Sequence, residues 1–395
     1  MSRLDELIAE LCHDGVEYKR IGEIADYEQP GKYLVSNTDY KEEYDIPVLT
    51  AGQTFVLGYT NEMAGIYPAS KENPVIIFDD FTGAFKWVDF PFKAKSSAMK
   101  MITAKEGIAL LRYLFHLMGF LNYTSDEHRR LWIGTYSEMM VPVPPLPVQR
   151  EIIRILDNFT ELTAELTAEL TARKKQYEYY QDYLLTFDSN IPIYKLGELC
   201  EIKGRIGFRG YTQNDFVTAG DGAVSLSPGN IIANHLYFDD CKYITWEKYY
   251  ESPEIMLSEN DVVLCKTGST VGKVAVVDYL PEKATLNPQL VVLKNIKCNY
   301  RYLFYQLSKA SIQARIKAMA GIGSVPNITQ KNISEIDIPV PSIEIQETIV
   351  RLLDRFDTLC NDISNGLPAE IAARQKQYEF YRDKLLTFKQ TEVFQ

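Results

Sequence analysis

The sequence lacks the features of a membrane protein and those of a secreted, disulfide-linked protein. No apolar run is long enough to cross a bilayer, and the nearest candidate, residues 107–121, is interrupted by Arg112 and His116. Arg3 and the acidic residues after it come too early for a signal peptide. The six cysteines stand singly, and the four histidines do not cluster with them. We therefore expect a cytoplasmic protein with free thiols and neither a disulfide framework nor a metal site.

The chain also lacks an excess of positive charge. Its formal net charge is −11, which argues against nucleic-acid binding by the whole surface, because phosphates attract basic groups. The charge is unevenly distributed, since residues 190–337 carry +1 and residues 14–140 carry −5. If the protein binds DNA, we expect it to use local patches, with help from a more basic partner.

Length and composition are those of an ordinary globular protein. At 395 residues the chain is long enough for two or three domains, each with its own core. Hydrophobic residues make up 46% and charged residues 24%, which is typical of neither disordered nor fibrous proteins. The organisation of the chain must therefore be read from its pattern.

The most informative pattern is a passage that occurs twice. Residues 141–187 and residues 338–388 share, in the same order, Pro-x-Pro, Gln, Ile, Leu-Asp, Lys-Gln-Tyr-Glu and Leu-Leu-Thr-Phe. Shorter matches lie upstream, and the offset between matched residues grows from 175 to 201 along the chain. The segments between the repeated passages absorb most of this growth, which is typical of a rigid frame with variable inserts. A duplicated frame suits a target with two half-sites at a fixed spacing.

The repeat predicts an α+β protein in which two globular α/β segments are separated by a long antiparallel two-helix coiled-coil spacer, as an internal pseudo-two-fold repeat. Buried strands are expected at 74–78 and 261–265, and helices at 107–121 and 300–319. The expected divisions are 1–140 (first globular segment with an N-terminal helix), 141–189 (central spacer), 190–337 (second globular segment) and 338–395 (C-terminal spacer).

The two helical passages differ in one respect. Both begin after prolines, which the first turn of a helix tolerates because its amides have no partner there. The first contains Thr-Ala-Glu-Leu twice in succession over 163–170, whereas the second has four extra residues around 365–368 that include Gly then Pro. This predicts a continuous first helix and a broken second helix. The apolar stripes expected to pack the helices together are Leu162, Leu166 and Leu170 in the first and Phe356, Leu359 and Ile363 in the second.

Together these features resemble the specificity subunit (HsdS) of type I restriction-modification systems, over nearly the whole chain. The resemblance rests on the two x-Pro-x-Pro…Gln…Ile…Leu-Asp passages, the two Lys-Gln-Tyr-Glu-(Tyr/Phe)-Tyr passages and the tandem Thr-Ala-Glu-Leu. Residues 76–81, 90–92 and 96–100 also look like one class of the family's recognition domains. Each motif alone is weak, but all of them in this order are specific.

The resemblance implies a DNA-reading subunit without catalysis of its own. Each globular segment would be a target-recognition domain that reads a few base pairs of a split, asymmetric site in double-stranded DNA. The helical passages would hold these domains apart and dock two modification subunits, which methylate adenine with S-adenosylmethionine. Restriction subunits, which use ATP and magnesium, would complete the complex. No cofactor or metal site is then expected in this chain.

DNA contacts are expected from turn residues whose side chains suit phosphates or base edges: lysine, arginine, amides and hydroxyls. The alternative is that most of them are solvated surface groups, and we expect at most about half to touch DNA. The candidates in the first segment are Lys32, Gln53, Thr54, Lys86, Lys95 and Ser97. Those in the second are Arg205, Arg209, Tyr211, Lys266, Lys273, Ser324 and Asn327.

Three enzyme-like patterns are weaker. Residues 267–273 resemble a phosphate-binding loop, but the glycine spacing is short by one and Val274 replaces the required Ser or Thr. A stand-alone site-specific endonuclease is the alternative function, with Glu17 and an upstream acid as metal ligands, but the second copy has Ile193 at the matching position. The paired acids 79–80 and 239–240 are better explained as turn or hydrogen-bonding residues than as metal ligands. A scaffold that has lost DNA binding is a third possibility.

Overall fold

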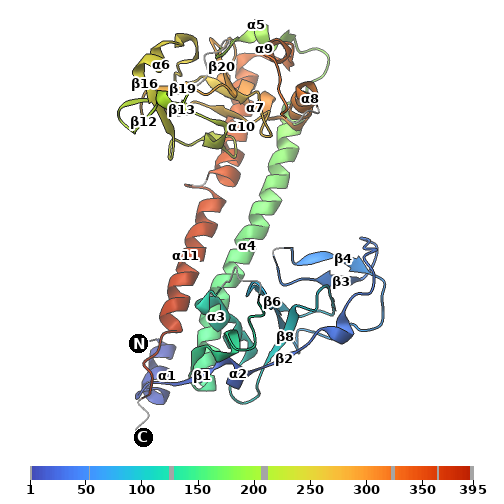
Figure 1. Ribbon diagram of the computed structural model, residues 1–395. Coiled ribbons are helices and arrows are strands. Elements are labelled where there is room, and N and C mark those ends of the chain that lie inside the picture. Colours follow the sequence, from blue (N-terminus) through green and yellow to red (C-terminus); the bar gives the residue numbers. More distant parts are fainter. Residues whose placement is uncertain are drawn as a thin grey trace. The chain divides into compact units, whose positions relative to one another are not determined.

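The computed structural model describes residues 2–52, 54–123, 129–205, 212–321, 325–362 and 364–391 (Figure 1). It divides into two units. Unit 1 comprises Met1–Ala164 and Ala373–Gln395, and unit 2 comprises Glu165–Ala372. Both units mix helix and sheet, which confirms the predicted α+β class. Among the described residues, no helix combines the length and apolarity needed to cross a bilayer.

Unit 1 is a three-layer arrangement built around one antiparallel sheet. Alternate residues of the central strand β5 point to opposite faces, as the period of a strand requires. Ile76 and Phe78 pack against α3, whereas Val75 and Ile77 pack against a second, smaller sheet. The elements are α1 Arg3–Leu11, β1 Glu17–Arg20, α2 Ile21–Ile24, β2 Ala25–Glu28, η1 Gly31–Tyr33, β3 Ile46–Leu49, β4 Val56–Thr60, β5 Val75–Asp79, β6 Phe85–Val88, β7 Lys93–Ala94, β8 Met99–Ala104, α3 Leu111–Leu121, η2 Tyr136–Glu138 and β9 Met140–Val143.

Unit 2 repeats this plan. Its sheet β11-β20-β17-β18 has the same order as β2-β8-β5-β6 in unit 1, and in each unit a parallel strand pair forms part of the second sheet. The elements are β10 Ile193–Lys195, α5 Leu196–Leu199, β11 Glu201–Gly204, η3 Gln213–Asp215, β12 Phe216–Val217, β13 Gly222–Leu226, η4 Pro228–Asn230, β14 Ile231–Ile232, β15 His235–Leu236, β16 Lys242–Thr245, α6 Trp246–Tyr250, η5 Pro253–Ile255, β17 Val262–Cys265, β18 Val274–Val276, β19 Ala284–Leu286, β20 Leu290–Lys294, α7 Tyr300–Ser308, α8 Ala310–Ala320, α9 Gln330–Ser334 and β21 Asp337–Pro339.

Three long helices complete the chain: α4 Leu146–Leu184, α10 Ile343–Asn361 and α11 Leu367–Leu385. The predicted continuous first helix is confirmed, because α4 runs without interruption for 39 residues. The predicted broken second helix is also confirmed, because α10 ends at Asn361 and α11 begins at Leu367. In unit 1 the start of α4 packs on the end of α11, where Phe159 stacks on Tyr381 with ring centroids 5.2 Å apart. In unit 2 the end of α4 packs on α10, where Tyr180 stacks on Phe356 at 5.4 Å.

The break between α10 and α11 is a defined turn within unit 2. The carboxylate of Asp362, which caps α10, accepts hydrogen bonds from the amides of Ser364 and Asn365, at 2.7 and 3.1 Å. Gly366 lies so close to the end of α10 that an added Cβ would be 2.4 Å from the Thr358 carbonyl oxygen. Glycine is therefore required by close approach, and α11 begins at the next residue.

Two expectations about the helices need correction. The helix expected over 300–319 is two helices, because Lys309 adopts an extended conformation between α7 and α8. The expected apolar stripes are only partly buried: Leu162 and Leu359 are each 36% exposed. The buried face of α10 is instead formed by Ile349, Leu353 and Cys360, which pack in the unit 2 core. The expected apolar stripe of α10 therefore lies at the edge of its buried face. Leu166, Leu170 and Phe356 are half-buried, and Ile363 lies outside the described residues.

Candidate nucleic-acid interface and its joints to the helices

In unit 1 the repeated residues form a joint that attaches the sheet and α3 to α4. The Tyr113 hydroxyl donates to the Pro142 carbonyl at 3.1 Å, and the Arg112 guanidinium contacts the Asp157 carboxylate at 2.8 Å. The buried amide of Gln149 accepts from the Leu110 N–H at 2.9 Å and donates to the carbonyls of Ile108 and Pro144 at 3.0 and 2.8 Å. We call Arg112, Tyr113, Gln149 and Asp157 the unit 1 joint.

Unit 2 contains the same joint, formed by the matching residues Arg301, Tyr302, Gln346 and Asp354. The Tyr302 hydroxyl donates to the Pro339 carbonyl at 2.8 Å, and Arg301 contacts Asp354 at 2.9 Å. The Gln346 amide accepts from the Asn299 N–H at 2.9 Å and donates to the Pro341 carbonyl at 2.8 Å. The duplicated sequence is therefore explained by a duplicated attachment of each sheet to its helix.

The two joints are completed by different side chains. In unit 1, buried His116 lies between the Asp157 carboxylate, 2.9 Å from Nε2, and the Tyr378 hydroxyl, 3.1 Å from Nδ1. Burial lowers the pKa of His116, although Asp157 opposes this effect. In unit 2 the matching residue is Tyr305, whose hydroxyl donates to Asp354. The acceptor is therefore the same, but only unit 1 has a titratable imidazole at this position.

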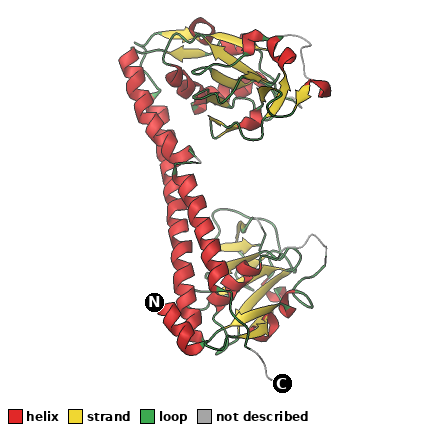
Figure 2. Ribbon diagram, turned by 90° about the vertical axis from the view of Figure 1, so that its left-hand side faces the viewer, coloured by secondary structure: helices red, strands yellow, loops and turns green. Residues whose placement is uncertain are grey.

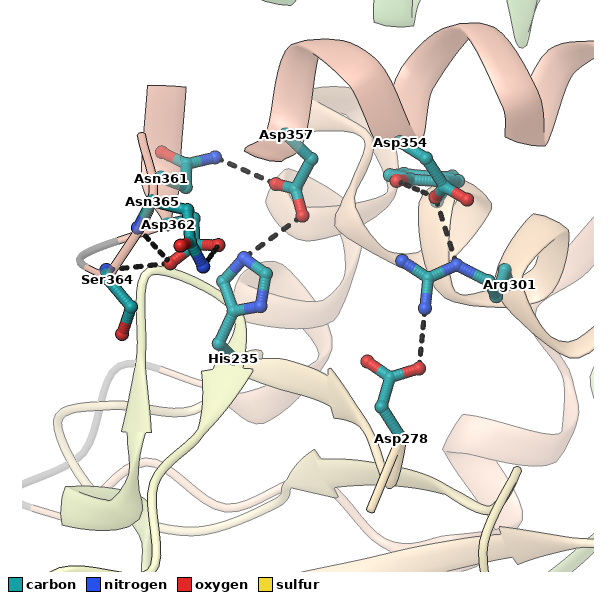
Figure 3. A network of polar contacts seen from close by, with 10 residues as sticks. His235, Asp278, Arg301, Asp354, Asp357, Asn361, Asp362, Ser364 and Asn365 are labelled. Atoms are coloured by element: carbon teal, nitrogen blue, oxygen red, sulfur yellow. Dashed lines mark hydrogen bonds and ion pairs between the residues drawn. The ribbon is translucent and has the colours of Figure 1, made fainter. Parts of the chain in front are cut away.

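Unit 2 has a second polar network beside the helix break (Figure 3). His235, from β15, lies with Nε2 3.0 Å from the buried carboxylate of Asp357, and Asn361 donates to the same carboxylate at 2.9 Å. When His235 is protonated, this contact is an ion pair. The Asp357 carboxylate raises the pKa of His235 against the opposing effect of burial, with further help from Asp278 and Asp362.

In unit 1, three of the expected DNA-contacting residues gather at one edge of the smaller sheet. Because β3 and β7 are parallel, with Leu49 opposite Ala94, the turns after both strands emerge at the same edge. Thr54 and Ser97 are exposed there, and Lys95 donates to the Tyr40 hydroxyl at 3.1 Å. Two hydroxyls and an ammonium group at a sheet edge have the chemistry that phosphates and base edges require.

The other unit 1 candidates lie elsewhere. Lys32, in η1, is paired with Glu28 at 2.7 Å on the surface. Lys86 is half-buried in β6, the edge strand of the larger sheet. Gln53 lies outside the described residues. These assignments stay predictions.

In unit 2, three candidates gather at one end of the larger sheet. Strand β20 lies between β11 and β17, with Val291 opposite Gly204 and Leu290 opposite Cys265, so Arg205 and Lys266 leave the sheet at the same end. Asn327 joins them, because the Thr267 hydroxyl donates to its side-chain carbonyl at 2.7 Å. Arg205 is mostly buried, whereas Asn327 is exposed.

Lys273 is engaged inside unit 2. Its ammonium group donates to the carbonyls of Ile231 and Pro228, at 2.8 and 3.3 Å, and so supports the turn before β14. A structural role therefore accounts for this lysine, and its DNA contact stays an untested prediction. Arg209, Tyr211 and Ser324 lie outside the described residues.

Two surface groups were missed from the sequence. In unit 1, exposed Arg130 lies 3.7 Å from Asp80, whose carboxylate also pairs with Lys100 at 3.0 Å and accepts the Trp132 N–H at 2.8 Å. In unit 2, the Lys283 ammonium lies 5.7 and 5.5 Å from the ring centroids of Trp246 and Tyr250. The adjacent arginines 129–130 and the aromatic run 246–250 were the available signals.

The enzyme-like patterns do not assemble into sites. Asp79 accepts the amides of Phe81 and Thr82 at 2.9 and 3.0 Å, so it is a turn residue as expected. The Asp5 carboxylate accepts the Ser2 N–H at 2.8 Å in the capping box of α1, and Glu17 pairs with Lys19 at 3.0 Å. Over the described part of the chain, no group of three or more His, Cys, Asp and Glu side chains could hold a metal ion.

Comparison with known proteins places this geometry in a family. Residues 13–173 and 189–373 match the family described as "Type I restriction modification DNA specificity domain". The chain is 43% identical to the type I restriction enzyme EcoR124I/EcoR124II specificity subunit of Escherichia coli, over 100% of this chain and 98% of that protein. It is 28% identical to a putative type I restriction enzyme specificity subunit of Haemophilus influenzae, over 94% and 96% of the two chains.

Solved structures share the fold. The type I restriction-modification S subunit from M. genitalium matches with a TM-score of 0.59 at 14% identity, over 94% of this chain and 96% of that one. A chain from a study of assembly and conformational transition of the type I R-M system matches with a TM-score of 0.56 at 17% identity, over 94% and 97%. At such low identity these matches concern the fold alone.

Proposed function

The chain belongs to the family of DNA specificity subunits of type I restriction-modification systems, and from this premise we propose that it reads a two-part, asymmetric DNA site and catalyses no step itself. The observation that carries the proposal is the duplicated joint. One frame, built twice, presents two sheets whose polar surface groups differ. Two sheets with different surface groups, held by equivalent joints, suit a DNA site whose two half-sites differ in sequence.

The residues that would contact DNA lie mainly at the sheet edges. In unit 1 we propose the edge with Thr54, Lys95 and Ser97, together with the exposed guanidinium of Arg130. In unit 2 we propose the edge with Lys266 and Asn327. Lysine and arginine would fix the register on phosphates, and hydroxyl and amide groups would discriminate base edges.

Partners would supply the chemistry that this chain lacks. We propose that two modification subunits dock on the helical passages and methylate adenine in the site with S-adenosylmethionine, and that restriction subunits, which use ATP and magnesium, join them. The helices would set the distance between the two half-sites. The net charge of −11 is consistent with DNA binding to which more basic partners contribute.

Mapping of methylated adenines tests the proposal. The chain is assembled with its modification subunits and incubated with genomic DNA and S-adenosylmethionine, and modified adenines are sequenced. We expect one motif in two parts around an unread gap. A single uninterrupted motif would contradict the two-part reading.

Two variants assign the half-sites. Asn327→Ala should weaken discrimination at positions in one half only, and Ser97→Ala at positions in the other. Each good base contact accounts for about 1–3 kcal/mol, so methylation rates should fall about 5- to 160-fold. In a separate assay, the purified chain is incubated with DNA and magnesium alone. Cleavage there would favour the endonuclease alternative.

A further inference from the structure

In unit 2 a short connection joins the second sheet to the larger one. Residues 287–289 run from the end of β19 to the start of β20 (strands in yellow in Figure 2). Asn287 and Gln289 lie in this connection, and neither is among the DNA-contacting candidates predicted from the sequence. Gln289 is exposed and Asn287 is half-buried. The connection therefore presents two carboxamides at the surface of unit 2.

The internal duplication relates this connection to the DNA-reading edge of unit 1. There, residues 95–98 join β7 to β8 in the same way, and β7 pairs in parallel with β3 as β19 pairs with β13. Residues 95–98 include Lys95 and Ser97, the proposed DNA contacts of unit 1. In unit 2 the Lys266 N–H donates to the Gln289 carbonyl at 2.8 Å, so Gln289 also adjoins the lysine proposed for this unit. Topology and a direct hydrogen bond therefore both place Gln289 at the proposed reading edge.

The backbone of the connection is held at each residue. The Asn287 N–H donates to the Leu226 carbonyl at 2.8 Å, and the Leu290 N–H donates to the Asn287 carbonyl at 3.2 Å. The ring of Pro288 fixes its own φ, and the Gln289 N–H donates to the side-chain oxygen of Asn287 at 3.0 Å, which forms an Asx turn. Gln289 therefore has little backbone freedom to lose when it binds a ligand.

The side chain of Asn287 also orients the carboxamide of Gln289. Asn287 Nδ2 donates to Gln289 Oε1 at 3.1 Å, and the Gln289 side chain makes no other hydrogen bond within the described residues. A carbonyl oxygen has two acceptor sites, so one stays available beside the two Nε2 hydrogens. Gly268 keeps the approach open, because a Cβ added there would lie 3.4 Å from Nε2. Gln289 therefore presents an acceptor and a donor side by side.

An adjacent acceptor and donor match the major-groove edge of adenine. Adenine has its N7 acceptor beside its N6 donor, whereas guanine has two acceptors there. We propose that Gln289 is a specificity-determining residue that accepts from N6 and donates to N7 of a base-paired adenine in the half-site of unit 2, and that Asn287 is its positioning residue. This inference rests on the proposed function, because it requires that unit 2 reads DNA.

DNA that contains an adenine analogue tests the contact directly. The full-length chain is assembled with its modification subunits, and 7-deazaadenine replaces each adenine of the half-site that Asn327→Ala affects, one at a time. This analogue lacks the N7 acceptor but keeps Watson–Crick pairing. Binding is measured instead of methylation, because the analogue could also alter methyl transfer. We expect one adenine at which the affinity of the parent falls about 2- to 13-fold, the effect of one hydrogen bond.

The variant Gln289→Ala removes the proposed reader. It should lower the affinity for the unmodified site about 5- to 160-fold, the effect of a bidentate pair, and should be insensitive to 7-deazaadenine at that position. Sensitivity that persists in Gln289→Ala would overturn the proposal, and so would a parent that is sensitive at no adenine of this half-site. Because Gln289 is exposed, the fold should survive the substitution.

A matched control lies at the other end of β20. Asn295 is also exposed, and its amide donates to Glu201 at 2.9 Å. Its φ is +52°, which glycine tolerates, so Asn295→Gly removes an amide without backbone strain. This variant should bind both DNAs as the parent does. A loss of affinity as large as that of Gln289→Ala would count against a contact specific to Gln289.

The variant Asn287→Asp tests the positioning role. The new carboxylate still accepts the Gln289 N–H, so the turn is kept, but it cannot donate to Oε1 and attracts the Nε2 amide instead. We expect the preference for adenine over 7-deazaadenine to fall towards that of Gln289→Ala, with unchanged thermal unfolding. A preference equal to that of the parent would refute the role of Asn287.

Methylation mapping separates a failure of this inference from a failure of the proposed function. If the parent and Gln289→Ala give the same two-part motif with equal affinity, the reading by Gln289 is overturned and the proposed function stands. A single uninterrupted motif from the parent would contradict the proposed function and this inference with it.

Discussion

Unit 1 and unit 2 hold their sheets to the helices with the same hydrogen bonds but stabilise those joints with different charges. Unit 1 places buried His116, whose pKa is lowered by burial, between Asp157 and Tyr378. Unit 2 has Tyr305 at that position and an ion pair of His235 with Asp357 one turn further along α10. The lesson is that the duplicated geometry is set by backbone carbonyls and the two glutamines, while the titratable groups around them have diverged.

The helices to which the two joints are attached, α4 and α10, also differ. The unit 1 joint is attached to α4, which continues unbroken, whereas the unit 2 joint is attached to α10, which ends at Asn361. The ion pair of His235 with Asp357 and the turn at Asp362 lie at that end (Figure 3). A helix end exposes unpaired carbonyls, so it needs the specific turn and capping contacts that a continuous helix does not.

The largest effect is expected from lengthening the continuous helix. One more Thr-Ala-Glu-Leu unit after Leu170 adds about 6 Å and a rotation of about 40°, because each residue rises about 1.5 Å and turns about 100°. We expect methylation at the original site to be lost and to reappear at a site whose unread gap is one or two base pairs longer, since a base pair occupies about 3.4 Å.

Methylated-adenine sequencing reads the new gap directly. The control places four residues in the turn around residue 365, where the helix is already interrupted, and should not produce the same regular change of spacing. Altered bases within the half-sites, rather than an altered gap, would refute the role of α4 as a spacer.

A smaller effect, confined to unit 1, is expected from Lys100→Met. Lys100 and Asp80 are each about 1% exposed, and removing Lys100 leaves the buried Asp80 carboxylate with only the exposed Arg130 guanidinium, 3.7 Å away, as a cationic partner. Loss of one partner of a buried pair costs about 3–5 kcal/mol. Hydrogen exchange should report lost protection in unit 1 and unchanged protection in unit 2. Lys266→Met, near the same end of the matching sheet in unit 2, should change stability by less than about 0.5 kcal/mol.

The two joint glutamines allow a direct comparison of the units. Gln149→Ala and Gln346→Ala each leave buried backbone groups without partners, at about 1–3 kcal/mol per variant. Gln149 makes three hydrogen bonds and Gln346 two, so the unit 1 variant should be the more damaging. Urea unfolding measures both. A larger loss of stability for Gln346→Ala than for Gln149→Ala would contradict this ranking.

The smallest effect is a difference in pH response. The pKa of His235 is raised in the folded chain, so its ion pair contributes fully below about pH 6.5, the unfolded value, and is lost as the pH rises through the folded pKa. The pKa of His116 is lowered, so unit 1 loses stability as the pH falls below about 6.5. Hydrogen exchange should therefore show the α10–α11 turn loosening at high pH and α3 loosening at low pH.

Matched variants isolate each histidine. His235→Gln should abolish the pH dependence at the α10–α11 turn and leave that of α3 unchanged, and His116→Gln should do the reverse. A shared loss of both dependences would show that one titration controls both units.

Much of the architecture could be predicted from the sequence, because it is encoded by local pattern. The apolar runs at 74–78 and 261–265, the prolines before each long helix and the insertion that contains Gly then Pro predicted the α+β class, two strands and a broken second helix. The structure places these strands at 75–79 and 262–265. The burial of the helix faces was predicted less well. Leu359 lies next to buried Cys360 in α10, and only the packing of α10 on the unit 2 core decides which of these two side chains is covered.

The candidate site could be predicted only in part for a similar reason. Turn residues such as Lys95 and Lys266 could be proposed from their chemistry, but the parallel pairing of β3 with β7 decided that Lys95 and Thr54 share an edge. The carbonyls that engage Lys273 belong to residues 42 and 45 positions away, and no local pattern reveals them. Arg130 was missed because its neighbour Asp80 comes from a distant strand end.

By itself, the sequence determined that one frame is built twice, because the same order of prolines, glutamines and tyrosines occurs twice in the chain and can be read without the structure. Only the tertiary structure decided which contacts the repeated residues make and where unit 1 and unit 2 differ. Hydrogen bonds such as that from Tyr302 to Pro339 join residues far apart in the chain. Such contacts depend on how whole elements pack, and packing is a property of the folded molecule.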